Sequence, residues 1–373
     1  MLRTERIVGL LDDFDHLSVE RAIAEFRSGR PVLVTDAAES ALVTSAEALD
    51  GERSDTLSDV ADGRARLALP SARLRRLGVE RTVPGVVALP VVDHDRIETL
   101  ALKLDARIDA PVGQAGPVDQ LALELAALSL VMPAVVVIPV ARESVDQAVM
   151  VVSGHALRSY RPAMARQIHV VSRAPVPLEG APDTEFVVFR GGEGLRDQVA
   201  IVVGKPDLEK PVSVRLHSAC LTGDLFGSLK CDCGDQLRST VRFMTENGGG
   251  ILLYLDQEGR GNGIANKIRA YKLQSQGYDT YDADEMLGFD LDQRRFGFAA
   301  EMLKQLGVSK VAILTNNPVK IAALENAGLE VVEDRRVHGR PTSENVLYLA
   351  SKRDRAGHYI DLDDLVTHKP VND

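Results

Sequence analysis

Apolar and polar positions along the first part of the chain alternate between a helix-like and a strand-like spacing. Ala22, Ile23 and Phe26 recur on one helical face, and Gly29 follows the last turn of that helix. Residues 32–34 are then continuously apolar, which is typical of a buried strand. Because similar segments continue through the first half of the chain, this region is expected to fold around a core of its own.

The second half shows a clearer alternation of strands and helices. Strands are expected at QVAIVV, PVSVRL, ILLYL and KVAILT, and helices over residues 235–247, 263–276 and 292–306 and after Pro318. This alternation predicts an α/β fold of mixed α+β character. Between the halves, residues 174–182 hold three prolines and a glycine, which resist both helix and sheet. We therefore expect two domains, residues 1–173 and 183–373, joined by a linker.

The composition restricts the partners and the compartment. The chain has 373 residues, of which 45% are hydrophobic and 26% charged, as in a soluble globular protein, and its net charge is −10. An acidic balance disfavours broad binding to nucleic acid or to an anionic membrane, so neither partner is expected. Pro133 and Pro139 interrupt the longest apolar stretch, and acidic residues interrupt the apolar positions of the N-terminus. With neither a spanning nor a secretion segment, we expect a cytoplasmic protein.

The cysteines of the chain are only three, Cys220, Cys231 and Cys233, and they lie in the single segment RLHSACLTGDLFGSLKCDCGDQ. An odd, clustered set without a secretion signal argues against disulfides. Three thiolates can bind zinc and leave a fourth position for a water, which the metal acidifies. His217 precedes Cys220 closely, so a closed structural site of three cysteines and one histidine remains an alternative. Three unrelated buried thiols are a weaker alternative, because cysteine is scarce here yet clustered.

Several loops that follow predicted strands carry cationic or glycine-rich groups. Residues 258–260 (EGR) form a glycine-rich loop that can bring backbone N–H groups and an arginine to a phosphate. Arg294 and Lys320 lie near further strand ends, where α/β sheets usually bind ligands. Each motif by itself also fits an ordinary helix cap or turn. Tyr271 shares a helical face with Ile268, which by periodicity alone favours a core aromatic.

The order of these motifs resembles the GTP cyclohydrolase II family of riboflavin biosynthesis. The resemblance extends from about Asp183 to His358 and rests on RLHSACLTGD, SLKCDCG, QEGRG, NKIRAY, QGYDT, LGFD and LTNNPVK. Several motifs in one order are far more specific than any one of them. The resemblance implies a GTP cyclohydrolase II-like fold with a zinc site in the C-terminal half, and a homodimer.

The resemblance also implies roles for individual positions. The zinc ligands of the family match Cys220, Cys231 and Cys233. The catalytic positions match Asp292 as proton acceptor, Arg294 at the α-phosphate, and Tyr271, which overturns the core-aromatic interpretation of that tyrosine. The GTP-binding positions match Arg215, Leu216, His217, Ser218, Ala219, Gln236, Glu258, Gly259, Arg260, Thr280, Thr315 and Lys320.

The implied reaction opens the purine ring of GTP. A zinc-activated water attacks C8, the imidazole ring opens and formate leaves, while pyrophosphate is released with the help of Mg²⁺. The implied product is 2,5-diamino-6-(5-phosphoribosylamino)pyrimidin-4-one. Phosphoryl chemistry needs positive charge around the oxygens, which Arg260, Arg294 and Lys320 can supply. A buried carboxylate such as Glu258 can accept hydrogen bonds from the guanine N1–H and amino group.

Three positions depart from the family pattern, which often has glutamate at Ala219 and usually has arginine at Asp256 and isoleucine at Asn262. The cysteines and the Asp-x-Arg pair are intact, so activity is expected. Because the departures lie in binding loops, two alternatives remain, a paralogue that stops at a formamidopyrimidine product and a GTP-binding regulator without turnover. A zinc-stabilised nucleic-acid module is disfavoured by the acidic charge.

The N-terminal half resembles 3,4-dihydroxy-2-butanone-4-phosphate synthase, which is often fused ahead of this domain. AIAEFRSGRPVLVTD matches the opening helix and strand of that family. The acidic run that holds magnesium there is reduced here to DAAESALVTS, with Asp36 and Glu39 as the remaining acids. A hard cation needs several carboxylates, so residues 1–173 are expected to form a degenerate domain without synthase activity, with a structural, dimerising or regulatory role.

Overall fold

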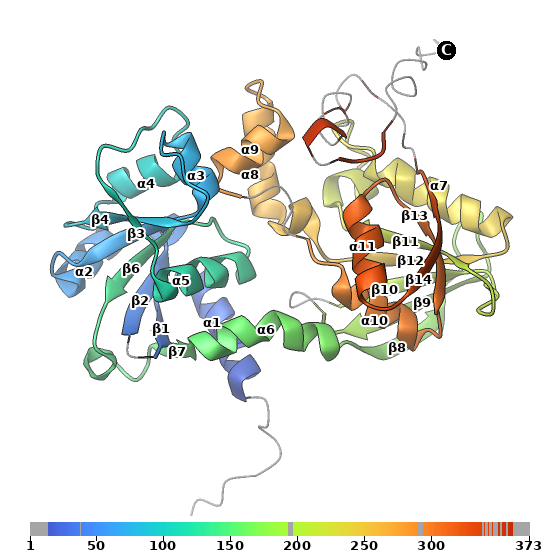
Figure 1. The fold of residues 1–373 in the computed structure, drawn as a ribbon, viewed down its shortest axis with the longest axis horizontal. Helices are drawn as coiled ribbons and strands as arrows, with labels where there is room; N and C mark the ends of the chain where they lie inside the picture. Colours follow the sequence, from blue (N-terminus) through green and yellow to red (C-terminus); the bar gives the residue numbers. More distant parts are fainter. Residues whose placement is uncertain are drawn as a thin grey trace, which may run out of the picture. The chain divides into compact units, whose positions relative to one another are not determined.

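The computed structural model describes residues 14–37, 39–192, 197–289 and 294–337, together with residues 339, 342, 345, 350, 353–355 and 357–360. The chain divides into two compact units, of which unit 1 comprises Met1–Arg161 and Asp284–Asp290 and unit 2 comprises Pro162–Ala283 and Leu291–Asp373. Each unit is built on one seven-stranded sheet with helices packed against it (Figure 1). The expected mixed α/β class is confirmed, and the two sheets agree with an organisation in two domains.

Unit 1 is an α/β layer structure whose sheet has the strand order β5-β4-β3-β6-β2-β1-β7. Its strands are β1 Val32–Asp36, β2 Glu39–Ser45, β3 Ala65–Leu69, β4 Gly85–Leu89, β5 Val112–Gln114, β6 Val135–Pro139 and β7 Met150–Ser153. Its helices are α1 Phe14–Arg27, α2 Gly51–Ala61, α3 Ser71–Arg76, α4 His94–Leu102 and α5 Pro117–Leu128, and α6 Gly154–Arg166 runs from unit 1 into unit 2. Neighbouring strands are antiparallel except β1 and β7, which are parallel.

The opening helix and strand form where the hydrophobic pattern predicts them. Helix α1 buries Ala22, Ile23 and Phe26, and β1 begins with three buried residues. Gly29 adopts a φ of +78°, a left-handed conformation that glycine tolerates best, so the chain turns there from helix into strand.

Unit 2 has the strand order β14-β13-β11-β12-β10-β9-β8. Its strands are β8 His169–Pro175, β9 Thr184–Arg190, β10 Gln198–Val203, β11 Val212–Ser218, β12 Gly250–Leu255, β13 Lys310–Leu314 and β14 Glu330–Arg335. Its helices are α7 Cys233–Glu246, α8 Ile264–Gln274, α9 Thr280–Met286, whose last turn clusters with unit 1, α10 Gly297–Gln305 and α11 Pro318–Asn326. Strands β14, β13, β11 and β12 are parallel, and β12, β10, β9 and β8 are antiparallel.

The parallel part of this sheet positions the functional loops. Val214 and Leu216 of β11 and Ile313 of β13 are fully buried in a core that includes Phe298 of α10. Helix α7 contributes Met244 to a second cluster of buried core residues. Because β11, β12 and β13 are parallel, their carboxyl ends meet at one edge of the sheet, which is where loops of α/β folds gather ligands.

The boundary between the units differs from the expected one. Residues 174–182 were expected to form an interdomain linker, but β8 pairs antiparallel with β9, so this stretch ends β8 and turns back within unit 2. The division falls at Arg161 and Pro162, inside α6. The side chains of β8 are all exposed. The strand therefore lacks the alternation of buried apolar and exposed polar residues by which a strand is recognised in a sequence.

Residues 284–290 form part of unit 1, although the expected boundary assigned them to the second domain. Arg73 of α3 is only 2% exposed. Its guanidinium donates hydrogen bonds of 2.7, 2.7 and 2.8 Å to the main-chain oxygens of Leu100, Lys103 and Met286. These oxygens lie at the ends of α4 and α9, where helix dipoles favour a cation. Burial lowers the pKa of Arg73 to about 10, so the group remains charged at neutral pH.

Among the described residues, no helix combines the length and the apolar character that crossing a membrane requires.

Candidate metal centre and nucleotide pocket

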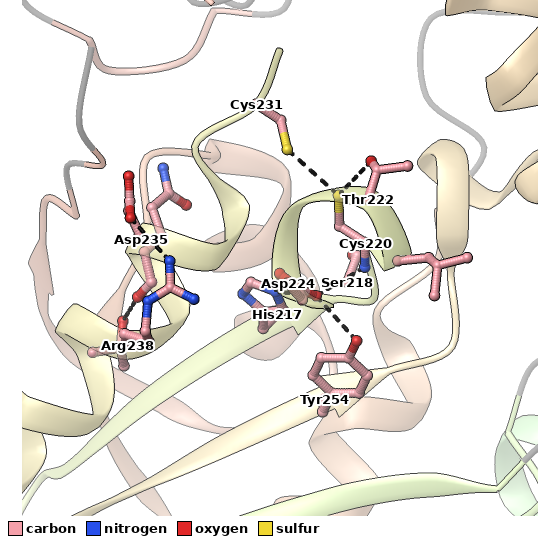
Figure 2. Close-up of polar contacts among 12 residues, drawn as sticks. His217, Ser218, Cys220, Thr222, Asp224, Cys231, Asp235, Arg238 and Tyr254 are labelled. Carbon is pink, nitrogen blue, oxygen red and sulfur yellow. Dashed lines mark hydrogen bonds and ion pairs between the residues drawn. The ribbon is translucent and has the colours of Figure 1, made fainter. Parts of the chain in front are cut away.

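The three cysteines converge where β11 ends and α7 begins. Cys220 follows β11, Cys231 lies just before α7, and Cys233 is the first residue of α7. All three sulfurs lie within 4.8 Å of one another. Figure 2 shows the Cys231 sulfur directed at that of Cys220, at a distance of 3.7 Å. Two thiolates on a tetrahedral zinc, with Zn–S distances of about 2.3 Å, have sulfurs about 3.8 Å apart. The spacing therefore suits a tetrahedral thiolate site.

Gly223 gives an independent test of that site. A Cβ placed on this glycine would lie 2.4 Å from Sγ of Cys231 and 3.0 Å from Sγ of Cys220. The backbone of the π-helical turn Leu221–Leu225 therefore packs directly against the sulfurs, at a distance that no side chain permits. A glycine at this position is what a preformed thiolate cluster requires.

The donor set favours zinc over a hard cation, because thiolates are soft ligands. Within the described residues, the cluster contains the three cysteines and no fourth ligand. His217, the alternative fourth ligand, has neither ring nitrogen within 4.8 Å of all three sulfurs, and its Nε2 faces Asp224, 3.0 Å away. The geometry thus favours a centre with an open position over a closed site of three cysteines and one histidine.

Neighbouring groups favour the thiolate form of Cys220. Hydrogen bonds from Cys231 and Cys233, together with the nearby Lys267 ammonium, lower the pKa of the Cys220 thiol despite its burial. The contact with Cys220 raises the pKa of Cys231 to about 11. Of this pair, Cys220 is the sulfur whose thiolate form its surroundings favour.

Asp224 organises the turn behind the sulfurs. Its carboxylate accepts hydrogen bonds from the Cys220 backbone N–H at 2.9 Å, from the Tyr254 hydroxyl at 3.0 Å and from His217 Nε2 at 3.0 Å (Figure 2). A carboxylate only accepts, so Nε2 of His217 carries the proton. Burial lowers the pKa of His217, even though Asp224 raises it, so the buried imidazole is neutral. Burial and the Asp224 charge both raise the pKa of Tyr254, which keeps its hydroxyl a donor.

Glu258 and Tyr271 lie beside the cysteine cluster. The Glu258 carboxylate accepts hydrogen bonds from the backbone N–H groups of Leu221 and Gly259, at 2.6 and 3.0 Å, and from Lys267 Nζ at 2.7 Å. The Tyr271 hydroxyl lies 3.4 Å from Oγ1 of Thr222, which itself lies 3.8 Å from the Cys220 sulfur. Tyr271 is therefore close to the sulfurs and is not a core aromatic.

A cationic pocket opens beside Cys233 at the carboxyl ends of β11 and β13. Most of the GTP-binding positions inferred from the resemblance line it, namely Arg215, His217, Ser218, Gln236, Arg260, Thr315 and Lys320, together with Arg294. Arg215 and Lys320 are each only 6% exposed, and Thr315 is fully buried. Burial lowers the pKa of Arg215 to about 10, which leaves it charged at neutral pH. Four cationic side chains around one pocket are suited to a polyanionic ligand.

Neighbouring groups hold these cations in place. Lys320 Nζ donates to the Leu216 oxygen at 2.6 Å, and an Arg215 nitrogen donates to the Leu314 oxygen at 2.9 Å. Arg260 packs over the ring of Tyr281, 3.9 Å from its centroid. Arg260 has a φ of +61°, which is rare for a residue with a side chain and costs roughly 1 kcal/mol or more. The loop therefore tolerates strain to aim this guanidinium into the pocket.

The remaining predicted positions lie elsewhere in unit 2. Leu216 is a core residue of β11 whose oxygen accepts from Lys320. Ala219 donates its backbone N–H to the Leu255 oxygen at 2.7 Å, and Thr280 opens α9, where its hydroxyl accepts from Gln274. Neither Ala219 nor Thr280 lines the pocket. Asp292, the predicted proton acceptor, lies outside the described residues.

Several residues of the site were not singled out from the sequence. Asp224 and Lys267 lie inside the motifs LTGD and NKIRAY, so the resemblance included both residues but assigned them no role. His358 and Tyr281 also line the pocket. Tyr359 donates its backbone N–H to the Asn316 oxygen at 3.0 Å, which brings the C-terminal stretch to the pocket wall.

Comparisons with known proteins agree with these features. A family model described as GTP cyclohydrolase II matches residues 169–336. The GTP cyclohydrolase-2 of Xylella fastidiosa (strain Temecula1) is 42% identical over 352 residues, which cover 93% of this chain and 88% of the relative. The GTP cyclohydrolase-2 of Azospirillum brasilense is 36% identical over 93% of this chain and 95% of its own length. The riboflavin biosynthesis protein RibBA of Phocaeicola vulgatus is 31% identical over 91% of this chain and 97% of its own.

Among solved structures, the two-domain 3,4-dihydroxy-2-butanone 4-phosphate synthase RibBX of A. baumannii covers 86% of this chain and 99% of its own, with 17% identity and a TM-score of 0.34. The 3,4-dihydroxy-2-butanone 4-phosphate synthase of Candida albicans covers 38% of this chain and 96% of its own, with 15% identity and a TM-score of 0.31.

Proposed function

The chain belongs to the GTP cyclohydrolase II family, and we propose that it hydrolyses GTP with the help of one zinc ion held by Cys220, Cys231 and Cys233. The proposed reaction opens the imidazole ring of guanine and releases formate and pyrophosphate. Its product is 2,5-diamino-6-(5-phosphoribosylamino)pyrimidin-4-one, an intermediate of riboflavin biosynthesis.

One observation carries the proposal: the sulfur cluster and the cationic pocket have a residue in common. Cys233 belongs to the cluster and also lines the pocket. His217 and Ser218 line the same pocket and lie at the end of β11, just before Cys220. A nucleotide whose phosphates occupy the pocket can therefore present its base to the metal centre.

The chemistry that zinc supplies when bound is Lewis acidity, which activates water for attack on an electrophilic carbon such as C8 of guanine. The protein contributes the surroundings. Asp224 fixes the backbone of Cys220 and the ring of His217, so the sulfurs need little reorganisation. Tyr271 places its hydroxyl near Thr222 and Cys220, and we assign it to the positioning of the base.

The cations of the pocket bind and orient the triphosphate. Arg215, Arg260 and Lys320 supply fixed positive charge, and Arg294, whose nitrogen lies 3.5 Å from the Ser218 hydroxyl, is assigned to the α-phosphate. Such positive charge stabilises the charge that develops on the phosphate oxygens during pyrophosphate release. Asp292 is proposed as the proton acceptor from its match to the family.

We propose Mg²⁺ as an aid to pyrophosphate release, again from the family resemblance. Among the described residues that line the pocket, Asp232 supplies a carboxylate that can bind this ion. One carboxylate and the triphosphate oxygens form the kind of ligand set that Mg²⁺ commonly takes, with waters completing it.

Unit 1 is proposed to lack synthase activity. The Asp36 carboxylate, one of the two acids that remain of the expected magnesium run, forms an ion pair with Arg158 at 2.6 Å. The Arg158 guanidinium lowers the pKa of Asp36 and neutralises its charge locally. A carboxylate engaged by arginine is a poor ligand for a hard cation.

The proposal also includes the assembly and the compartment. The protein is proposed to be a cytoplasmic homodimer with no nucleic-acid or membrane partner.

The direct experiment incubates the purified protein with GTP and Mg²⁺ and follows formate, pyrophosphate and the pyrimidine product. Release of all three supports the proposed reaction. Pyrophosphate without formate would identify a paralogue that stops at a formamidopyrimidine, and GTP binding without either product would identify a regulator.

A further inference from the structure

Lys267 of α8 connects the sulfur cluster to the loop that carries Glu258. Its Nζ lies 3.0 Å from Sγ of Cys220 and 2.7 Å from Oε1 of Glu258. The side chains of Lys267 and Glu258 are each 11% exposed, so the contact is largely shielded from water. Charged hydrogen bonds in such surroundings are much stronger than the same contacts on a surface.

The position of this ammonium is fixed by several contacts. Glu258, which holds it on one side, is itself held by the backbone N–H groups of Leu221 and Gly259. Lys267 Nζ also lies 5.6 Å from the centroid of the Tyr271 ring. The ammonium therefore donates to a cysteine sulfur and to a carboxylate at the same time, which fixes a positive charge at the edge of the cluster.

Three thiolates around one divalent ion leave an excess of one negative charge in a mostly buried position. A neighbouring cation that donates to one of the sulfurs offsets this charge and fixes the orientation of that sulfur. Removal of a residue that hydrogen-bonds to a metal ligand, without touching the metal itself, commonly weakens metal binding by about 10- to 100-fold. Lys267 donates such a hydrogen bond to the Cys220 sulfur.

We propose that Lys267 is a positioning residue of the metal centre, which holds the Cys220 thiolate in place and sets the affinity of the three cysteines for zinc. Lys267 does not line the nucleotide pocket, so it acts through Cys220 and not on the triphosphate. The proposal rests on the proposed zinc centre. It adds to that centre a residue whose role concerns metal retention and thiolate character.

The test compares Lys267→Met with Lys272→Met in the full-length protein. Lys272 lies on the same helix but is exposed, so this control removes an equal charge away from the sulfurs. Zinc affinity is measured by competition with a chromophoric chelator. We expect K267M to weaken zinc binding about 10- to 100-fold and K272M to leave it within about twofold of the wild type.

Glu258→Gln and the double variant E258Q/K267M separate two causes of a weaker site. In K267M, the Glu258 carboxylate loses its cation and stays near the sulfurs, so repulsion by Glu258 alone can weaken zinc binding. If Lys267 acts through Cys220, E258Q/K267M binds zinc about 10-fold or more weakly than E258Q does. Equal affinities of E258Q and E258Q/K267M would overturn the proposal.

Substitution of the site with Co²⁺ provides a second readout that does not depend on turnover. Loss of a hydrogen bond to a thiolate makes the sulfur more electron-rich, so the thiolate-to-metal absorption band of K267M should move to longer wavelength. An unchanged band together with unchanged zinc affinity in folded K267M would refute the role of Lys267. In contrast, zinc binding by Cys231→Ser equal to that of the wild type would refute the proposed metal centre itself, so the two failures are distinguishable.

Discussion

Lys320 donates a hydrogen bond of 2.6 Å from Nζ to the main-chain oxygen of Leu216, the last core residue of β11 before His217. The bond connects α11 to the strand that leads to the cysteine cluster. It also holds a buried ammonium at the pocket wall, where a triphosphate is proposed to bind.

Lys320→Met is expected to raise the KM for GTP about 10- to 100-fold, because charge-assisted hydrogen bonds contribute about 1.5–3 kcal/mol. Steady-state kinetics with GTP measures the change. Lys304→Met on α10 removes an exposed lysine as a control and should leave KM unchanged. An unaltered KM in folded K320M would show that the triphosphate lies elsewhere.

Gly223→Ala is expected to remove stoichiometric zinc, because the added Cβ would lie 2.4 Å from Sγ of Cys231. The turn must move away from the sulfurs or the cysteine must rotate, and either change breaks the ligand geometry. Metal analysis of the purified variant measures the loss. Gly297→Ala is the matched control, since a Cβ there meets no atom within 4 Å. Normal zinc content in G223A would contradict the observed packing of the turn.

The stability of a truncated protein that contains unit 2 is expected to depend on the residue at which the chain begins. A chain that begins at Pro162 keeps β8 and Ile168, which is 2% exposed and part of the core, whereas a chain that begins at Asp183 loses both. Loss of a buried isoleucine alone costs about 2–5 kcal/mol. Thermal unfolding should therefore give a clearly lower Tm for the shorter chain. Both chains lack the same part of unit 1, so equal Tm values would place β8 outside the folded unit.

The stability of the metal-free protein is expected to fall as the pH falls below the ordinary histidine pKa of about 6.5. Burial lowers the pKa of His217, so the folded state keeps this ring neutral while the unfolded chain takes up a proton. The stability is fully present above pH 6.5 and is lost on acidification toward the lowered pKa. His217→Gln should flatten a plot of Tm against pH between about 7 and 5.5, and exposed His155→Gln should not. An equal slope in H217Q would assign the pH dependence to other groups.

Much of unit 2 follows from local patterns. The strands β10, β11, β12 and β13 and the glycines after α7 have apolar runs and stop signals that are readable in sequence. The cysteines and the cations of the pocket were identified because the motifs that carry them follow strand ends, and parallel strands bring those ends to one edge of a sheet.

Other features depend on contacts that no local pattern encodes. Asp224 holds Cys220, Tyr254 and His217 only because the chain folds back in a π-helical turn. The contact of Lys267 with Cys220 depends on how α8 crosses the cluster, whereas helical periodicity specifies only which face Lys267 occupies. Residues 284–290 cluster with unit 1 through the buried guanidinium of Arg73, which is far away in sequence.

The measurement that tests the central claim most directly is the zinc content and the rate of formate release of Cys231→Ser, compared with the wild type and with the exposed Ser239→Ala on α7. Cys231 lies 3.7 Å from Cys220 in the sulfur cluster, so its loss leaves two thiolates for the ion. The account predicts that C231S loses both zinc and formate release, while S239A keeps both. Formate release from GTP at the normal rate by zinc-free C231S would contradict a mechanism that depends on this metal centre.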